Sequence, residues 1–340
     1  REKFVPGIKI GKLGLEKTLE NDLIGVNDIQ RYEVNAYGKR INQLEYQKGL
    51  QGSKIRLTVD TEVQKLSAQL LSNKAGSISV MDIYTGDVIA MYSSPSYDPN
   101  LFLFGISHDE WELIRNNPLK PLINKTLSGL YSPGSTIKPI VALSALENNI
   151  INPNFKVKCT GKTELYGQTF HCWKEKGHGF VNLKNAMKQS CDTYFYEIAR
   201  LLGVDRLNIT AKKFGLGKKV LGDYFSNEKK GLFPNTSWKR NNLEKGWVLG
   251  ETLITGIGQG YTQTTPLQLC LMTAQIANGG YKIKPKIIVN NNPLTLEEAK
   301  KVMLDPRILL TDKENLKKEI LKYLDIFKDH PYIFNLGHGI

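Results

Sequence analysis

The sequence predicts a mixed α+β fold, and three observations support that class. Two runs rich in β-branched and apolar residues, 77–83 and 87–92, flank the turn sequence Tyr-Thr-Gly and predict an antiparallel hairpin. Apolar residues at helical spacing over 137–148 and 183–203 predict helices. The 340 residues are 41% hydrophobic and 23% charged, which is ordinary for a globular protein with a sizeable core.

The first part of the chain, residues 1–57, is rich in Gly, Asn and charged residues. We expect a small α+β appendage here, with a helix over about 13–23. The character changes near residue 57, and Asp60 is suited to cap the next helix. Apolar residues at helical spacing predict the buried face of that helix. They are Val63, Leu66, Leu70 and Leu71.

Later elements follow from local signals. A helix is expected over 207–214, and Thr265 is suited to cap a helix over 266–277. The run 281–289 predicts a short strand. Residues 290–340 form a polar tail with helical periodicity.

The formal net charge of +13 indicates either an anionic partner or a solvated basic surface. The basic residues are dispersed and no nucleic-acid-binding motif accompanies them, so nucleic-acid binding is not expected. A solvated surface is the simpler interpretation, and attraction to an anionic membrane face is the main alternative. The glycine-rich run 256–260 lacks the spacing of a nucleotide-binding loop.

A serine and a lysine stand at the start of the helix predicted over 137–148. Pro133 and Gly134 predict a tight turn, and Ser135 and Lys138 follow it three residues apart. Residues at this spacing share one helix face, so the hydroxyl and the amine can meet. The helix N-terminus favours a developing alkoxide, and a desolvated lysine can act as the base. The sequence therefore predicts Ser135 as a nucleophile activated by Lys138.

The same Ser-x-x-Lys spacing occurs again at Ser226 and Lys229. One such match is expected by chance in a chain of this length. Ser226 lies in a polar, charged stretch with no apolar helix after it. We therefore interpret the second match as a solvated loop.

Three cysteines and a histidine that lie close together in the sequence have the ligand set of a zinc site. They are Cys159, Cys172, His178 and Cys191. Zinc takes thiolate and imidazole ligands tetrahedrally, and four protein ligands make a site structural rather than catalytic. Cys191 is the middle residue of Ser190-Cys191-Asp192, so a metal would fix this tripeptide to the loop before it.

Other interpretations of these residues remain open. Cys159 and Cys172 can form a disulfide in an oxidising compartment. Alternatively the thiols are simply buried, and His178 serves the turn between two glycines. His171 is a substitute ligand that neighbours Cys172 directly. Cys270 lies among leucines on an apolar helix and is interpreted as core.

Several stretches resemble class B penicillin-binding proteins, in the order and spacing of that family. They are 11–16, 81–86, 93–95, 131–139, 177–179, 192–196 and 256–268. The likeness runs from about residue 7 to 289 and is greatest to the elongation-type penicillin-binding protein 2 subgroup. It implies the penicillin-binding transpeptidase fold, shared with serine β-lactamases, in which an antiparallel sheet lies between helical layers. It also implies a remnant of an N-terminal head domain (1–57) and a transpeptidase domain (58–289). The helical tail (290–340) does not look like the C-terminal third of the family.

By this resemblance, Ser135 is the acylated serine, Lys138 takes its proton, and Ser190 and Asp192 form the second catalytic motif. Many relatives have Ser-x-Asn there, and the elongation-type subgroup has an acid in the third place. The implied activity is D,D-transpeptidation of peptidoglycan stem peptides, inhibited by β-lactams. Relatives can also hold zinc in this region, with carboxylates in some of the ligand places.

The resemblance implies partners and a location as well. The expected substrates are stem peptides and the lipid-linked precursor. The expected partners are a membrane-embedded glycosyltransferase and proteins of the elongation complex. A single N-terminal anchor in the bacterial inner membrane would hold the catalytic domain in the periplasm. The chain begins at Arg1, so we expect the anchor to precede it.

The sequence departs from the family in one respect. The third catalytic motif, Lys-Ser/Thr-Gly, is expected after Val289 and is absent from the 340 residues. In the family its strand closes the oxyanion hole and binds the substrate carboxylate, so we expect slow or no acylation of these residues alone. The alternatives are a catalytically impaired scaffold of the elongation complex, and a β-lactamase or β-lactam sensor. The head-region sequence at 11–16 favours the transpeptidase over a secreted β-lactamase.

Overall fold

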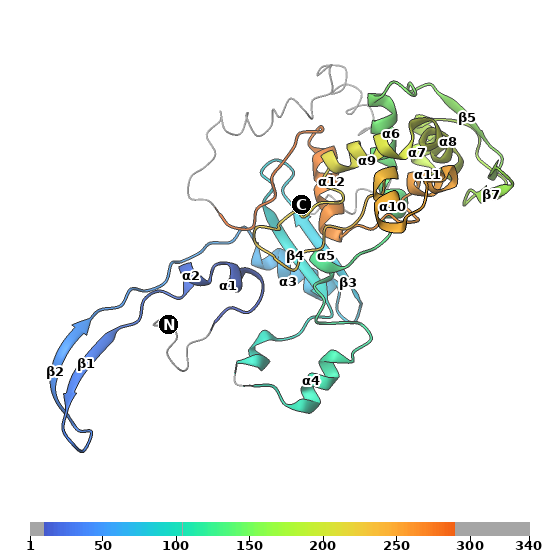
Figure 1. Cartoon of the computed structure of the whole chain (residues 1–340). Helices are drawn as coiled ribbons and strands as arrows, with labels where there is room; N and C mark the ends of the chain where they lie inside the picture. The colour runs from blue at the N-terminus through green and yellow to red at the C-terminus, as the bar shows by residue number, and fades with distance from the viewer. Residues whose placement is uncertain (1–9, 104, 290–340) are drawn as a thin grey trace.

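The computed structural model describes residues 10–103 and 105–289. Three parts follow one another: an N-terminal arm with a hairpin, a second hairpin flanked by helices, and a mainly helical lobe (Figure 1). The helices are α1 (Gly14–Thr18), α2 (Glu20–Leu23), α3 (Thr61–Leu70), η1 (Pro99–Phe102), α4 (His108–Arg115), α5 (Lys125–Ser128), η2 (Gly134–Ile137), α6 (Lys138–Glu147), α7 (Leu183–Lys188), α8 (Asp192–Leu202), α9 (Val204–Lys213), α10 (Thr236–Leu243), α11 (Leu249–Gly256) and α12 (Pro266–Ala277). The strands are β1 (Ile29–Val34), β2 (Arg40–Gln47), β3 (Gly76–Met81), β4 (Val88–Ser94), β5 (Lys156–Cys159), β6 (Lys162–Leu165), β7 (Gln168–His171) and β8 (Gly179–Asn182).

The N-terminal arm projects away from the rest of the chain (Figure 1). β1 and β2 pair antiparallel. The helix expected over 13–23 forms as two short helices, α1 and α2, because Leu19 departs from helical dihedrals between them. A two-stranded hairpin of this kind is only marginally stable alone. Its exposed apolar side chains are Val26, Ile29, Val34, Tyr37, Ile41, Leu44, Tyr46 and Leu50.

The hairpin predicted at 77–92 forms as β3 and β4. Asp82 Oδ1 accepts the backbone N–H groups of Tyr84 and Thr85 at 2.8 and 2.7 Å and closes the turn. Helix α3 packs on β4 and helix α12 packs on β3. Thr265 caps α12 as predicted, accepting the N–H of Gln268 at 3.2 Å. The hairpin is therefore flanked by helices, as the mixed fold class requires.

Helix α3 begins at the predicted cap, but its predicted buried face is only partly right, because Val63 and Leu71 are half-buried and the other two leucines are exposed. Asp60 Oδ1 accepts two backbone N–H groups of the first turn, at 2.9 and 3.0 Å. Leu66 and Leu70 are 48% and 59% exposed. Gln64 faces β4 instead, where its side-chain amide makes two hydrogen bonds with the backbone of Met91, at 3.0 and 2.8 Å. Those bonds satisfy two main-chain groups that a leucine would leave unpaired.

The strand predicted over 281–289 does not form a regular ladder. Lys286 bridges to Asp87 and Ile288 bridges to Leu57, as isolated pairs on two different segments. Pro285 has no N–H to contribute to a ladder. The tail predicted to be helical, 290–340, lies outside the described residues.

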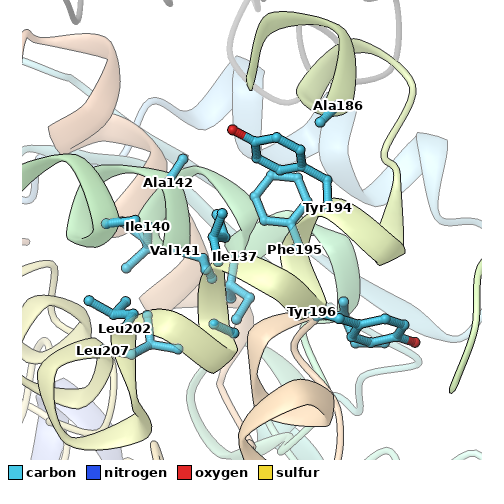
Figure 2. Close-up of a cluster of buried hydrophobic side chains, with 14 of the residues drawn as sticks. Ile137, Ile140, Val141, Ala142, Ala186, Tyr194, Phe195, Tyr196, Leu202 and Leu207 are labelled. Atoms are coloured by element: carbon cyan, nitrogen blue, oxygen red, sulfur yellow. The ribbon is translucent and has the colours of Figure 1, made fainter. Parts of the chain in front are cut away.

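An apolar core in the helical lobe fixes the start of α6 against the start of α8. Ile137, Ile140, Tyr194 and Phe195 are fully buried, and Figure 2 shows them in one cluster. Burying a large side chain contributes roughly 1.5–3 kcal/mol. The serine turn and the Ser190-Cys191-Asp192 motif are thus brought together by packing.

Candidate active site and Cys₃His cluster

Ser135 lies in η2, the 3₁₀ turn that leads directly into α6. Gly134 before it has φ +58°, a left-handed conformation that favours glycine. Its N–H donates to the carbonyl of Gly258 at 2.9 Å, and a Cβ on Gly258 would collide with the backbone of Gly134. Tyr131 and Thr264 exchange two backbone hydrogen bonds nearby, at 3.0 and 2.9 Å. The serine turn is therefore fixed against the glycine-rich loop.

Lys138 is 2% exposed and its amine meets three acceptors. Nζ donates to Ser190 Oγ at 2.8 Å, to the Ser190 carbonyl at 2.9 Å and to Asp192 Oδ1 at 2.7 Å. Ser190 Oγ in turn lies 3.1 Å from Ser135 Oγ. The direct contact expected between Ser135 and Lys138 is thus replaced by a link through Ser190, because the three N–H groups of the ammonium point to the motif.

Two opposing influences act on the Lys138 amine. Burial lowers the pKa of Lys138 below its ordinary value of 10.5, and the Asp192 carboxylate works against that shift. The hydroxyls of Ser135 and Ser190 can each donate or accept a hydrogen bond. Once the amine is neutral, the row from Ser135 through Ser190 to Lys138 can carry a proton away from the first serine.

The junction of α7 and α8 places Ser190 and Asp192. Ser190 has φ +50°, a conformation that costs a non-glycine residue on the order of 1–3 kcal/mol and clusters at functional sites. The N–H groups of Ser190 and Cys191 donate back to the carbonyls of Met187 and Ala186 at 3.1 and 2.9 Å. Asp192 then begins α8. As a result, the side chain and the carbonyl of Ser190 both face the lysine.

Three thiols and an imidazole meet beside this junction. The ligand atoms of Cys159, Cys172, His178 and Cys191 all lie within 4.8 Å of one another. His178 Nδ1 lies 3.5 Å from Cys159 Sγ and 3.6 Å from Cys172 Sγ. Tetrahedral zinc with ordinary bond lengths separates a nitrogen and a sulfur ligand by about 3.6 Å. All four cysteines of the chain are free, which contradicts the Cys159–Cys172 disulfide.

The cluster is largely shielded from solvent, with His178 half-buried. Its thiols are buried, and His178 Nε2 is buried with no hydrogen-bond partner among the described residues. Burial opposes ionisation of Cys159, but hydrogen bonds with Thr193 and His178 bring its pKa down to about 6. Burial raises the pKa of Cys191. His171, the substitute ligand, is exposed and lies outside the cluster.

Known protein families match the chain in two places. The family model of the penicillin binding protein transpeptidase domain matches residues 76–318. The chain belongs to this penicillin-binding protein family. The match continues past residue 289, where the likeness in the motifs ends. A second model, the penicillin-binding protein dimerisation domain, matches residues 1–57.

Individual penicillin-binding proteins agree with that assignment. The peptidoglycan D,D-transpeptidase MrdA of Acinetobacter baumannii is 38% identical over 281 residues, which are 82% of this chain and 42% of the relative. MrdA of Escherichia coli K12 is 37% identical over 295 residues, 86% of this chain and 46% of the relative. The chain therefore spans less than half the length of these curated relatives.

Solved penicillin-binding protein structures share the fold. PBP2 of Pseudomonas aeruginosa, in complex with WCK 5153, is 38% identical with a TM-score of 0.77 and covers 92% of this chain and 66% of its own. The complex of PBP2 and MreC from Helicobacter pylori gives 35% identity and a TM-score of 0.78, over 86% of this chain and 56% of that one. The predicted family and the mixed transpeptidase fold are confirmed.

One residue of the site in this penicillin-binding protein is not predicted from the sequence. Trp173 donates its backbone N–H to Asp192 Oδ2 at 3.1 Å, across 19 positions of the chain. Its indole also contacts the end of α7. The signal in the sequence is that Trp173 directly follows Cys172, a predicted zinc ligand. Local sequence patterns cannot predict its contact with Asp192, because that contact joins a loop to the start of a distant helix.

Proposed function

We propose that this chain belongs to a serine D,D-transpeptidase that cross-links peptidoglycan during cell elongation. The observation that carries the proposal is the hydrogen-bonded row from Lys138 through Ser190 to Ser135, which lies inside the residues matched by the transpeptidase family. Relatives at 37% and 38% identity are named peptidoglycan D,D-transpeptidases. The proposed transpeptidase domain is 58–289.

In the proposed reaction, Ser135 Oγ attacks the carbonyl carbon of the penultimate D-Ala of a stem peptide. Its proton moves to Ser190 Oγ while the Ser190 proton moves to the neutral amine of Lys138. The peptide bond to the terminal D-Ala breaks, and that D-Ala leaves with a proton returned along the same row. Ser135 keeps the acyl group as an ester until an amine of a neighbouring strand takes it.

A β-lactam would react at the same oxygen. Ser135 Oγ attacks the lactam carbonyl, the carbon–nitrogen bond of the ring breaks, and the ring nitrogen takes the proton. The leaving nitrogen stays tethered to the acyl group. The ester with Ser135 therefore persists, and the drug inhibits the enzyme.

Asp192 is assigned a supporting role. Its Oδ1 pairs with Lys138 Nζ at 2.7 Å, and both side chains are largely buried. The carboxylate holds the amine beside Ser190 and raises the pKa of Lys138 against the effect of burial. It thereby sets the pH range in which the lysine can accept a proton.

Asp192→Asn is expected to shift the pH dependence of acylation to lower pH. The rate rises as the pH approaches the pKa of Lys138, since the neutral amine is the base. Removing the carboxylate lowers that pKa, and an opposite charge at this distance is worth about 1–3 units. Stopped-flow acylation by a chromogenic β-lactam at several pH values measures the midpoint.

A matched control for this experiment removes a carboxylate from a different lysine. Glu147 pairs with Lys213 at 2.5 Å, away from the motif. Glu147→Gln should leave the pH midpoint of acylation where it is in the unmodified protein. An equal midpoint in Asp192→Asn and in the unmodified protein would rule out Lys138 as the base.

We further propose that the Cys₃His cluster binds zinc. The donor set of three thiols and one imidazole suits this metal, and the distances from His178 Nδ1 to the two sulfurs fit its tetrahedral geometry. Bound zinc would serve as a structural cross-link, with all four positions filled by protein. Cys191 would then hold the backbone between Ser190 and Asp192 to β5 and to the loop before β8.

Two other functions are distinguished by the fate of the acyl group. A catalytically impaired scaffold would not be labelled by penicillin. A β-lactamase would release the acyl group quickly, whereas a transpeptidase would keep it. Labelling with a fluorescent penicillin over time separates the three. The test uses the protein expressed from its whole reading frame and, in parallel, residues 1–340, for which we expect slow or no labelling.

Partner contacts are assigned to residues 1–57. This part matches the dimerisation domain, and its hairpin exposes apolar side chains on both strands. A similar protein from Helicobacter pylori was solved in complex with MreC, and another similar structure concerns a peptidoglycan synthase complex that coordinates polymerisation and crosslinking. The proposed partners are elongation-complex proteins and a membrane-embedded glycosyltransferase that uses the lipid-linked precursor.

The proposed location is the bacterial inner membrane, with the catalytic domain in the periplasm. Among residues 10–103 and 105–289, no helix has the length and apolarity needed to cross a membrane. The net charge of +13 favours an anionic lipid surface.

We expect the protein to bind anionic vesicles at low ionic strength and to bind them more weakly as salt is added, because salt screens the attraction. Equal sedimentation with neutral and anionic vesicles would contradict this.

A further inference from the structure

Trp173 is 64% exposed, yet both of its N–H groups are bonded to the Ser190-Cys191-Asp192 motif or to the residue before it. We infer that Trp173 is a positioning residue. It keeps Ser190 and Asp192 within hydrogen-bond distance of Lys138 and connects them to the Cys₃His cluster. The inference rests on the proposed function, because Ser190 and Lys138 matter through the proton they pass.

Trp173 holds the motif at two points. Its backbone N–H donates to Asp192 Oδ2 at 3.1 Å, opposite the oxygen that accepts from Lys138. Its indole Nε1 donates to the carbonyl of Gln189 at 3.0 Å and to that of Ser190 at 3.2 Å. The carboxylate is therefore held from both sides, and two successive carbonyls share one indole donor.

The indole bond acts on a strained residue. Ser190 has φ +50°, which a non-glycine residue keeps only where its surroundings hold it. Its carbonyl accepts from Lys138 Nζ and from the indole, and the Gln189 carbonyl accepts from the same indole. Without that donor, the peptide unit between Gln189 and Ser190 loses the bond to its carbonyl and keeps the bond from the Ser190 N–H to the Met187 carbonyl, so it can tilt about that bond. Ser190 Oγ would then leave its place between Ser135 Oγ and Lys138 Nζ.

The same side chain contacts the cluster. Trp173 follows Cys172 directly, and its ring packs edge-on against the imidazole of His178, with ring centroids 5.3 Å apart. The positions of Cys172 and His178 therefore set where the indole lies. Trp173 therefore couples the position of the cluster to the position of the Ser190 carbonyl. Cys191, which follows Ser190 directly, provides a second coupling through the backbone.

A different role for an exposed indole is contact with substrate. Trp173 lines a pocket of about 360 Å³ together with Lys162, His171 and Glu175. If the ring served as a platform for the ligand, its loss would weaken binding rather than slow the chemical step. The two roles therefore make opposite predictions for the dissociation constant and the acylation rate constant.

The test removes the indole N–H donor and keeps an aromatic side chain. Trp173→Phe, and a semisynthetic variant with benzothienylalanine at this position, both lack the indole N–H. We expect the first-order acylation rate at saturating β-lactam to fall on the order of tenfold to a hundredfold, as for a misplaced reacting group. The dissociation constant of the β-lactam should stay unchanged. Trp247→Phe is the matched control. The indole of Trp247 also donates a hydrogen bond, to Thr252 Oγ1 at a distance of 2.8 Å, but neither residue belongs to the motif.

An unchanged acylation rate in both Trp173 variants, or an effect confined to the dissociation constant, would overturn the inference. A second measurement does not depend on acylation. Amide hydrogen exchange at Ser190 and Cys191 should be faster in the Trp173 variants than in Trp247→Phe, and equal exchange would overturn it as well. If the unmodified protein expressed from its whole reading frame is not acylated at all, the proposed function fails, while the exchange experiment still decides whether Trp173 holds the motif.

Discussion

Ser135→Ala is expected to abolish covalent labelling by β-lactams. Ser135 supplies the oxygen that forms the ester, so its removal leaves no nucleophile in the row with Ser190 and Lys138. Lys138→Ala should lower the acylation rate by about 10²–10⁴-fold, which is the usual contribution of a positioned base. Intact-mass spectrometry after penicillin treatment of the protein from its whole reading frame measures both effects.

The second Ser-x-x-Lys match provides the control for this experiment. Ser226 is exposed and lies in a turn after α9, so Ser226→Ala should be labelled like the unmodified protein. Lys138→Ala leaves the Asp192 carboxylate without its partner, which costs about 3–5 kcal/mol when a buried pair is broken. Labelling is therefore compared per folded molecule, well below the unfolding temperature. An adduct that persists in Ser135→Ala would refute the assignment of the nucleophile.

Cys172→Ser is expected to remove bound zinc and to lower thermal stability and acylation together. A structural zinc site contributes its binding free energy to folding, so its loss costs several kcal/mol. Cys172 precedes Trp173, and Cys191 lies within the motif, so loss of the metal frees both supports of Ser190. Elemental analysis, thermal unfolding and penicillin labelling of the same preparation measure the three effects.

Cys270→Ser is the matched control for the zinc prediction. Cys270 is the fourth cysteine and lies outside the cluster, on α12, where its Sγ is 3.6 Å from the carbonyl of Ser79. This variant should retain zinc and acylation. Absence of zinc from the unmodified protein, purified without chelator, would refute the site. Retention of zinc with full stability in Cys172→Ser would do so too.

Elements with local signals were predictable from the sequence. The turn at Pro133 and Gly134 and the apolar residues after it fix η2 and α6 within one stretch of chain. Asp60 and Thr265 cap α3 and α12, because a side-chain oxygen next to free N–H groups needs no partner from elsewhere. The Cys₃His set was also found from residue types, although its spacing is not that of a zinc finger.

Features that depend on distant partners were not predictable. Leu66 was expected to be buried. Gln64 faces β4 instead, because its side-chain amide forms hydrogen bonds with the backbone of that strand. The spacing of Ser135 and Lys138 could not show that the lysine bonds to Ser190, because that contact joins the starts of two separate helices. The contacts of Trp173 are missed for the same reason. In each case the deciding hydrogen bond lies between segments far apart in the sequence.

The most direct test of the proposed activity uses a stem peptide that ends in D-Ala-D-Ala, together with an acceptor amine. The protein is expressed from its whole reading frame, and rapid quenching followed by mass spectrometry measures released D-Ala and the acyl group on the protein. We expect release of D-Ala, an acyl group on the peptide that contains Ser135, and a cross-linked product, all absent in Ser135→Ala. Labelling by penicillin without any release of D-Ala from the stem peptide would contradict the assignment as a transpeptidase.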